Sequence, residues 1–330
     1  MKEVRMETRK KEKSKKKMKM WKKVLIVLLM IPVTAAAVLT GLYLYMDNKP
    51  DIHRGYNEQI VTGGEIESHY LQTGGYETKK FTERAESPIK KYTVYYPAEL
   101  ETTDKKYPMI LVVNGTGGKA TKYEPVFDLY ASWGFIVVGT QDKGTGSGKT
   151  TIETLQYMLA QNDKESSLFY QKIDTENIGL TRFSQGGAAV FNALTKYDEG
   201  SYFKAVVPLS PVCEATAKQT TDYPYDSSQV TCPILLLAGT EGDFETELVI
   251  PINEMNAMYD KITSPKIMAR RVGAIHDEMM YSAGGYVIAW FRWQLQGDTY
   301  AANAFIGETP ELLTNSMYQD QRLDYEVNIE

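Results

Sequence analysis

The sequence is poor in the residues that build disulfide scaffolds and metal centres. It contains two cysteines and three histidines in 330 residues. Two cysteines cannot form a disulfide framework, and no histidines and cysteines cluster at the spacing of metal ligands. We therefore expect no metal and no cofactor. Cys213 and Cys232 should be free thiols, because the expected strands next to them place them near opposite edges of a sheet.

Basic residues are concentrated at one end of the chain. Residues 1–23 hold twelve Lys or Arg and three Glu, a net charge of +9, which leaves −14 for the rest of a chain whose net charge is −5. Contacts to nucleic-acid phosphates need a clustered basic surface, which such an acidic body lacks. The sequence therefore predicts no nucleic-acid partner.

Charge is absent from residues 24–46, "VLIVLLMIPVTAAAVLTGLYLYM". About 20 apolar residues suffice to cross a bilayer as a helix, and membrane helices tolerate a proline such as Pro32. The basic tail 1–23 predicts a cytoplasmic N-terminus and an extracellular body on a retained signal-anchor. The alternative is secretion after signal cleavage near "AAA" at 35–37, although the apolar run continues well past that site.

The sequence after residue 46 predicts one domain with an extension at each end. Residues 47–84 are polar and interrupted by glycines, which predicts a stalk and N-terminal extension. Apolar runs then alternate with periodic stretches of helical length, the pattern of a mostly parallel sheet with helices on both faces. The expected strands are residues 92–97, 109–114, 135–140, 178–181, 205–210, 234–239 and 266–272. We predict an α/β domain over residues 85–306 and a C-terminal tail over 307–330.

The stretch "NIGLTRFSQGGAAVFNAL" runs from a short strand into Ser184 and then into a helix. This is the layout of a nucleophile elbow, in which the serine occupies a strained turn between small neighbours. Gly186 fits this requirement, but Arg182 stands where a glycine is usual. Because Ser beside Gly is also ordinary turn chemistry, the motif alone leaves both interpretations open.

A second residue supports the elbow. A serine hydroxyl needs an imidazole to take its proton, and His276 follows the last expected strand. The other two histidines, His53 and His69, lie within residues 47–84. A lone histidine is often a packing residue, but the position and chain order of His276 favour the role of base.

The imidazole needs a carboxylate to fix its tautomer. In this layout the acid lies between the serine and the histidine, after a strand. We predict Asp243, because it lies just beyond the strand that ends at Gly239. Glu241 and Glu245 flank Asp243 and are the alternatives.

The oxyanion of an acyl-transfer intermediate needs two N–H donors. One is the backbone N–H of the residue after the nucleophile, Gln185. The other should come from the loop after an early strand, and "NGTGG", residues 114–118, provides such a loop. Thr116 is the predicted donor, although a plain glycine-rich turn would look the same.

In chain order, "NGTGG", "FSQGG", "GTEGD" and "GAIH" resemble the α/β-hydrolase superfamily, and within it the dienelactone-hydrolase and cutinase-like (polyester-hydrolase) branch. The stretch 286–305, a tryptophan-rich helix ending in Gly-Asp, is similar to the last helix of that branch. The resemblance covers about residues 85–306. It implies a nucleophile, acid and base at Ser184, Asp243 and His276, with oxyanion donors at Thr116 and Gln185.

The glycine loop "GTQDKGTGSGKTT" invites a different interpretation. A phosphate-binding loop requires G-x-x-x-x-G-K-[ST], but the position five before Gly148 is Lys143. We therefore expect no nucleotide. The loop should lie near the mouth of the hydrolase site instead.

These patterns predict a membrane-anchored extracellular serine hydrolase that acts on carboxylic esters. The same triad could serve a peptidase or an acyltransferase. A third alternative is a surface binding protein on an inactive hydrolase scaffold, suggested by Arg182 and by 23 tyrosines against 10 phenylalanines. The partners expected are an ester substrate, small or polymeric, and the membrane.

Overall fold

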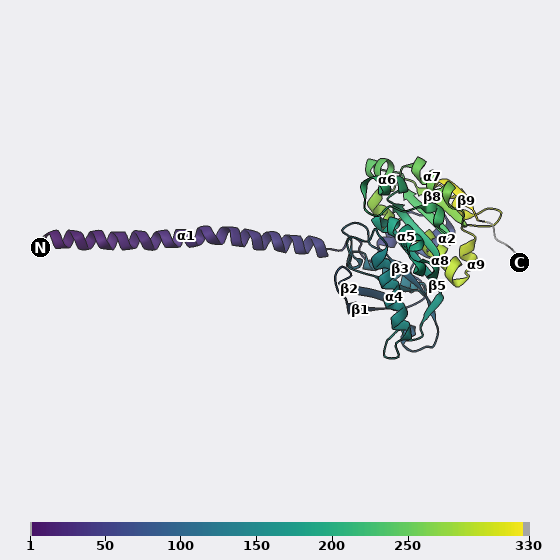
Figure 1. Cartoon of the computed structure of the whole chain (residues 1–330), viewed down its shortest axis with the longest axis horizontal. Helices are drawn as coiled ribbons and strands as arrows, with labels where there is room; N and C mark the ends of the chain where they lie inside the picture. Colours follow the sequence, from purple (N-terminus) through teal and green to yellow (C-terminus); the bar gives the residue numbers. More distant parts are fainter. Residues whose placement is uncertain (1, 326–330) are drawn as a thin grey trace. The chain divides into compact units, whose positions relative to one another are not determined.

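The computed structural model describes residues 2–325 and divides the chain into two compact units, Met1–Lys49 and Pro50–Glu330 (Figure 1). The first unit is a helix, α1 (Lys2–Asn48). By length and composition α1 could cross a membrane, with mean hydropathy 2.5 in its most apolar window. A signal sequence has the same properties. The charge-free residues 24–46 lie within it.

The second unit is built on a nine-stranded sheet in the order β1-β2-β4-β3-β5-β6-β7-β8-β9. Strands β3 to β8 are parallel to their neighbours within that group, whereas β1–β2, β2–β4 and β8–β9 pair antiparallel. The strands are β1 (Thr78–Arg84), β2 (Lys91–Pro97), β3 (Tyr107–Val112), β4 (Ile136–Gly139), β5 (Ile173–Ser184), β6 (Phe203–Pro211), β7 (Ile234–Gly239), β8 (Lys266–Arg271) and β9 (Tyr318–Asp324). The predicted mostly parallel α/β sheet is confirmed.

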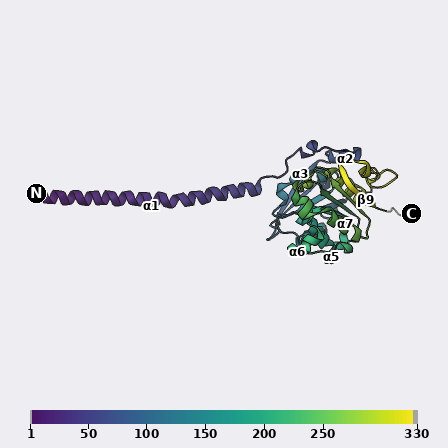
Figure 2. The ribbon, with the colours of Figure 1, turned by 90° about the horizontal axis from the view of Figure 1, so that it is seen from above.

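Helices cover both faces of this sheet, with α2 and α3 on one side and α5 and α6 on the other (Figure 2). The helices of the body are α2 (Glu65–Leu71), α3 (Glu124–Ser132), α4 (Lys149–Asp163), α5 (Gln185–Lys196), α6 (Glu214–Thr220), α7 (Ile252–Lys261), α8 (Gly284–Gln296), α9 (Thr299–Ala302) and α10 (Glu311–Thr314). Two buried apolar clusters fill the layers, one under α3 and α8 and one under α4, α5 and α7. The central parallel strands are therefore covered on both faces, which explains the long hydrophobic runs of β3, β4 and β7.

The body extends beyond the predicted limits of residues 85 and 306 at both ends. Strand β1 pairs with β2 over its full length, and β9 adds the last strand beside β8. The segment predicted as a stalk also includes α2, which buries Ile66 and Leu71. Both ends of the body are thus parts of the folded unit.

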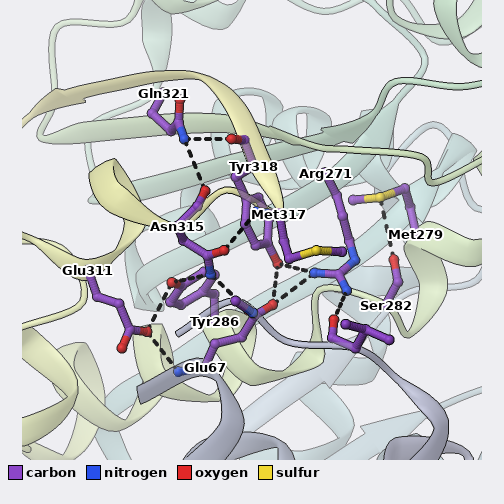
Figure 3. Close-up of polar contacts among 12 residues, drawn as sticks. Glu67, Arg271, Met279, Ser282, Tyr286, Glu311, Asn315, Met317, Tyr318 and Gln321 are labelled. Atoms are coloured by element: carbon purple, nitrogen blue, oxygen red, sulfur yellow. Dashed lines mark hydrogen bonds and ion pairs between the residues drawn. The ribbon is translucent and has the colours of Figure 1, made fainter. Parts of the chain in front are cut away.

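A buried polar network, here called the Glu67 cluster, connects these two ends (Figure 3). Glu67, on α2, is fully buried and pairs with Arg271 of β8 at 2.9 Å. Tyr318 Oη and Asn315 Nδ2 donate to the same carboxylate at 2.8 and 2.9 Å. The carboxylate of Glu311 accepts the N–H groups that open α2. Because buried charges are costly unless paired and hydrogen-bonded, this network specifies how the ends pack.

The two cysteines are free, as predicted, and both are buried. Cys213 follows β6, and Cys232 precedes β7. Burial raises the pKa of the Cys232 thiol to about 12, so this thiol is an unreactive packing group at neutral pH.

Candidate active site

Ser184 ends β5 in a strained conformation, with φ 60° and ψ −130°, and α5 begins at the next residue. A positive φ is uncommon for a non-glycine residue and marks stored strain. A Cβ added at Gly186 would lie 2.7 Å from the carbonyl oxygen of Asn114. Glycine therefore lets the loop after β3 pack against the first turn of α5. The strand, turn and helix form an elbow that places the serine, 9% exposed, at the carboxyl end of the central strand.

Arg182, the departure from the usual elbow pattern, directs its side chain toward α3. Its Cζ atom lies 3.7 Å from the centroid of the Tyr123 ring, next to the start of α3. The long side chain consequently leaves the first turn of α5 unobstructed. An arginine at this position is compatible with the elbow because its bulk packs elsewhere.

His276 opens a 3₁₀ turn, His276–Met280, after β8. Its imidazole is 7% exposed and lies between two aromatic rings, with centroids 5.1 Å from Phe183 and 5.0 Å from Phe244. Phe183 immediately precedes Ser184, so the imidazole packs against the elbow. Within residues 2–325, the buried Nε2 atom has no hydrogen-bond partner.

The carboxylate that meets this imidazole belongs to Glu245. Its Oε2 lies 2.6 Å from His276 Nδ1. Its Oε1 accepts hydrogen bonds from Ser210 Oγ at 2.5 Å and from the Gly239 N–H at 2.6 Å. Glu245 is only 1% exposed. Three bonds therefore fix its orientation.

The prediction that Asp243 contacts His276 is wrong. Asp243 is exposed and stands just before a π-helical turn, Phe244–Val249, that follows β7. A π-helical turn bonds i to i+5 and turns its residues differently from an ordinary α-helical turn. In this turn Glu245, one of the two alternatives, is the residue whose side chain reaches His276. Sequence spacing alone could not distinguish three acidic residues within five positions.

The loop after β3 lies over the elbow. Gly115 packs against Phe183, where an added Cβ would meet the ring at 3.0 Å. Thr116 is exposed at the next position, and its backbone N–H makes no hydrogen bond within the described chain. The N–H of Gln185, the first residue of α5, has no intrahelical acceptor. The structure thus brings Ser184, Gln185, His276 and the Thr116 loop to one edge of the sheet.

The glycine loop between β4 and α4 borders this same edge. The N–H of Thr145 donates to Gln185 Oε1 at 3.0 Å, and the N–H of Gly117 donates to the Lys143 carbonyl at 3.0 Å. Lys149 is 71% exposed and pairs at its surface with Glu153. The loop therefore contacts the elbow and the Thr116 loop, whereas the sequence predicted only that it lies near the mouth of the site.

A serine in a strained turn after a strand and an imidazole held by a buried carboxylate are features that α/β-hydrolases share. Together with the sheet order and the elbow, they define an α/β-hydrolase. Residues 66–322 match the family described as PET hydrolase-like, so the chain belongs to that family of esterases. The resemblance predicted from the motifs is confirmed.

One curated relative is the chloroplastic chlorophyllase-1 of Citrus unshiu. It is 28% identical over 183 residues, which are 50% of this chain and 52% of the relative. The chain spans about half the length of that protein. The similarity therefore supports a distant relationship within the esterases.

Proposed function

We propose that the protein is a carboxylic-ester hydrolase that uses Ser184 as nucleophile, His276 as base and Glu245 as the acid. The observation that carries this proposal is the bond between Glu245 and His276 Nδ1, which leaves Nε2 without a partner beside the elbow. Nε2 is the nitrogen that would take the serine proton. Membership of a family of ester hydrolases supports the same reaction.

The reaction would proceed in two halves. As the Ser184 hydroxyl attacks the acyl carbon, His276 Nε2 takes its proton, and Glu245 stabilises the resulting imidazolium. The N–H groups of Gln185 and Thr116 bind the oxyanion. His276 then protonates the departing alcohol, and a water molecule activated by the same nitrogen releases the acid from the acyl-enzyme.

Exposed apolar side chains beside His276 support an apolar group on the substrate. Phe244 is 55% exposed and lies edge-on to the imidazole, and Ile275, the residue before His276, is 46% exposed. Large apolar side chains grouped at a polar site often mark a ligand-binding surface. Esters with an apolar acyl or alcohol part would cover them.

The test uses the full-length protein in detergent with p-nitrophenyl acetate and butyrate. Ser184→Ala should lower kcat at least about 10³-fold, because the covalent route is lost. Labelling by a fluorophosphonate probe, which reacts with activated serines, should disappear in the same variant. Equal hydrolysis by wild type and Ser184→Ala would refute the proposal. Preferred cleavage of a matched amide over the ester would instead indicate a peptidase.

We further propose that α1 anchors the enzyme with residues 1–23 in the cytoplasm and the hydrolase body outside the cell. The proposal rests on the +9 tail beside the charge-free run. Intact-mass analysis of the mature protein should find the chain starting at its N-terminus, and protease added to right-side-out membrane vesicles should degrade the body. A mature chain starting near residue 38 would establish secretion instead.

A further inference from the structure

Arg182 lies directly behind the elbow in an unusual environment. The side chain is 2% exposed, and its Cζ atom stacks 3.7 Å from the ring centroid of Tyr123 and 5.5 Å from that of Phe183. Its Nε and Nη2 atoms are buried and have no hydrogen-bond partner in the described part of the chain. Arg182 therefore meets aromatic faces where a buried arginine ordinarily meets a carboxylate.

The guanidinium nevertheless remains a cation. Burial lowers the pKa of Arg182, while the hydroxyls of Tyr123, Tyr130 and Tyr56 act in the opposite direction. Arginine stays protonated in proteins. A desolvated cation over an aromatic face is held more strongly than an exposed one, so Arg182 fixes the position of the Tyr123 ring.

Tyr123 connects this cation to the Thr116 loop. Its hydroxyl donates a hydrogen bond to Asn114 Oδ1. The amide of Asn114 donates in turn to the carbonyl oxygens of Thr140 and Asp142, at 2.9 and 2.7 Å. Asn114 lies two residues before Thr116, so these bonds fix the start of the loop that carries one proposed oxyanion donor.

The same asparagine reaches the second proposed donor. Thr145 Oγ1 donates to the carbonyl oxygen of Asn114 at 2.6 Å, and the Thr145 N–H donates to Gln185 Oε1 at 3.0 Å. Asn114 therefore lies two residues from Thr116 in the chain and is linked through Thr145 to the side chain of Gln185. Asn114 is held by the tyrosine on which Arg182 stacks.

We propose that Arg182 is a positioning residue that acts through Tyr123 and Asn114 to hold the two oxyanion donors in register. The inference rests on the proposed hydrolase function and adds a role for the residue that departs from the elbow pattern. Arg182 itself touches no reacting atom. Its loss should displace the N–H groups while leaving substrate binding in the ground state intact.

A double-mutant cycle tests the route. In the full-length protein, Arg182→Met and Tyr123→Phe should each lower kcat for p-nitrophenyl butyrate about tenfold, with KM changed less than twofold, since oxyanion donors act in the transition state. The double variant should be no slower than the slower single variant, because the two residues act in series. Arg182→Lys, which keeps the charge but loses the planar stacking face, should fall between wild type and Arg182→Met.

A transition-state readout separates positioning from a merely structural role. An alkylboronic acid forms a tetrahedral adduct on an active serine, so its affinity should fall by the same factor as kcat/KM, while inhibition by the product butyrate stays unchanged. Tyr130→Phe is the matched control. It removes a hydroxyl near Arg182 that makes no bond to Asn114, and kcat should remain at the wild-type value.

The outcomes against the inference are distinct. Additive losses in the double variant, or unchanged kcat in Tyr123→Phe, would overturn it, and the second result holds even if Arg182→Met does not fold. A wild-type protein that the fluorophosphonate fails to label would instead mean that the proposed function itself fails. A labelled wild type with unaltered variants refutes the positioning role alone.

Discussion

The Glu67 cluster and the proposed active site each bury one glutamate and one arginine, but they arrange them differently. In the Glu67 cluster the two charges meet, with Arg271 Nη1 at 2.9 Å from Glu67. In the active site they are separate: Glu245 meets His276, and Arg182 stacks on tyrosine. The paired charges of Glu67 and Arg271 connect the two ends of the body. Glu245 and Arg182 do not pair with each other, and their separate contacts lie beside the elbow.

The difference teaches how the same residue types divide between stability and function. Burial would lower the pKa of Arg271, but Tyr318 and Glu67 outweigh it and raise the value overall. Burial lowers the pKa of Arg182, and tyrosines, Tyr123 first, act against it. A buried charge without a counter-charge is destabilising, and groups with strongly shifted pKa values cluster at functional sites. We expect substitutions in the two regions to affect different observables.

The largest expected effect lies in the active site. Glu245→Gln should lower kcat about 10³–10⁴-fold with little change in unfolding, because the imidazole loses the carboxylate that selects its tautomer. Asp243→Asn is the matched control and should stay within twofold of wild type, since that side chain is exposed. Ester hydrolysis in both variants is the measurement. A reversed ranking would restore Asp243 as the acid.

The Glu67 cluster should respond through stability. Glu67→Gln breaks a fully buried ion pair and should lower the free energy of unfolding by about 3–5 kcal/mol. Glu153→Gln, which breaks an exposed pair with Lys149, should change it by less than about 1 kcal/mol. Urea titration measures both, and active-site titration should show unchanged kcat per folded molecule. A large effect on kcat would show that the two regions are coupled and would contradict the division between stability and function.

Arg182→Met should not lower the free energy of unfolding as Glu67→Gln does. Replacing an unpaired buried charge by an apolar side chain of similar length should leave the free energy of unfolding unchanged or raise it by up to about 4 kcal/mol. Arg271→Met should lower it, because Glu67 would be left without its cation. Urea titrations of the two variants side by side provide the check. Destabilisation of equal size in both would show that Arg182 stabilises the fold as Arg271 does.

The smallest effect concerns alkaline pH. Burial raises the pKa of Tyr123 to about 12, from an unfolded value of 10. Between these values the folded state holds a proton that the unfolded state has released, so stability falls as pH rises. Tyr123→Phe should remove about 1.4 kcal/mol of that fall per pH unit above pH 10. Unfolding at pH 9, 10 and 11 measures it, and parallel curves for wild type and variant would contradict it.

Most of the sheet could be predicted from the sequence, because the strands buried on both faces have unbroken apolar runs. Strands β1 and β9 could not. Their sequences, "TKKFTER" and "YQDQRLD", are mostly polar, because these strands form the exposed edges of the sheet. The polarity of residues 47–84 suggested a stalk for the same reason, although Glu67 is one of the most buried residues of the body.

The prediction of the site was limited by turn geometry. Chain order pointed to Ser184 and His276, which stay in the proposed site, since each follows a recognisable strand. The proposed acid, Glu245, lies in a π-helical turn that no local sequence pattern predicts. Ser210, which donates to Glu245, was also missed, because a serine at the end of an apolar strand has no distinguishing signal. The connection from Arg182 to Asn114 runs through Tyr123, and the sequence does not indicate that this ring contacts both residues.

The Glu67 cluster also sets an order of events during synthesis. Glu67 bonds to Tyr318, 251 residues later in the chain, and the first N–H groups of α2 bond to Glu311 after an interval of 244 or 245 residues. At about 5–20 residues per second, these partners leave the ribosome on the order of 10–50 s after α2 does. Until then the Glu67 carboxylate lacks the Asn315 amide and the Tyr318 hydroxyl, and the N–H groups of Ile66 and Glu67 lack their acceptor. The Glu67 cluster is therefore complete only after β9 has been synthesised, and removal of the final fifteen residues would take the Tyr318 hydroxyl from the Glu67 carboxylate.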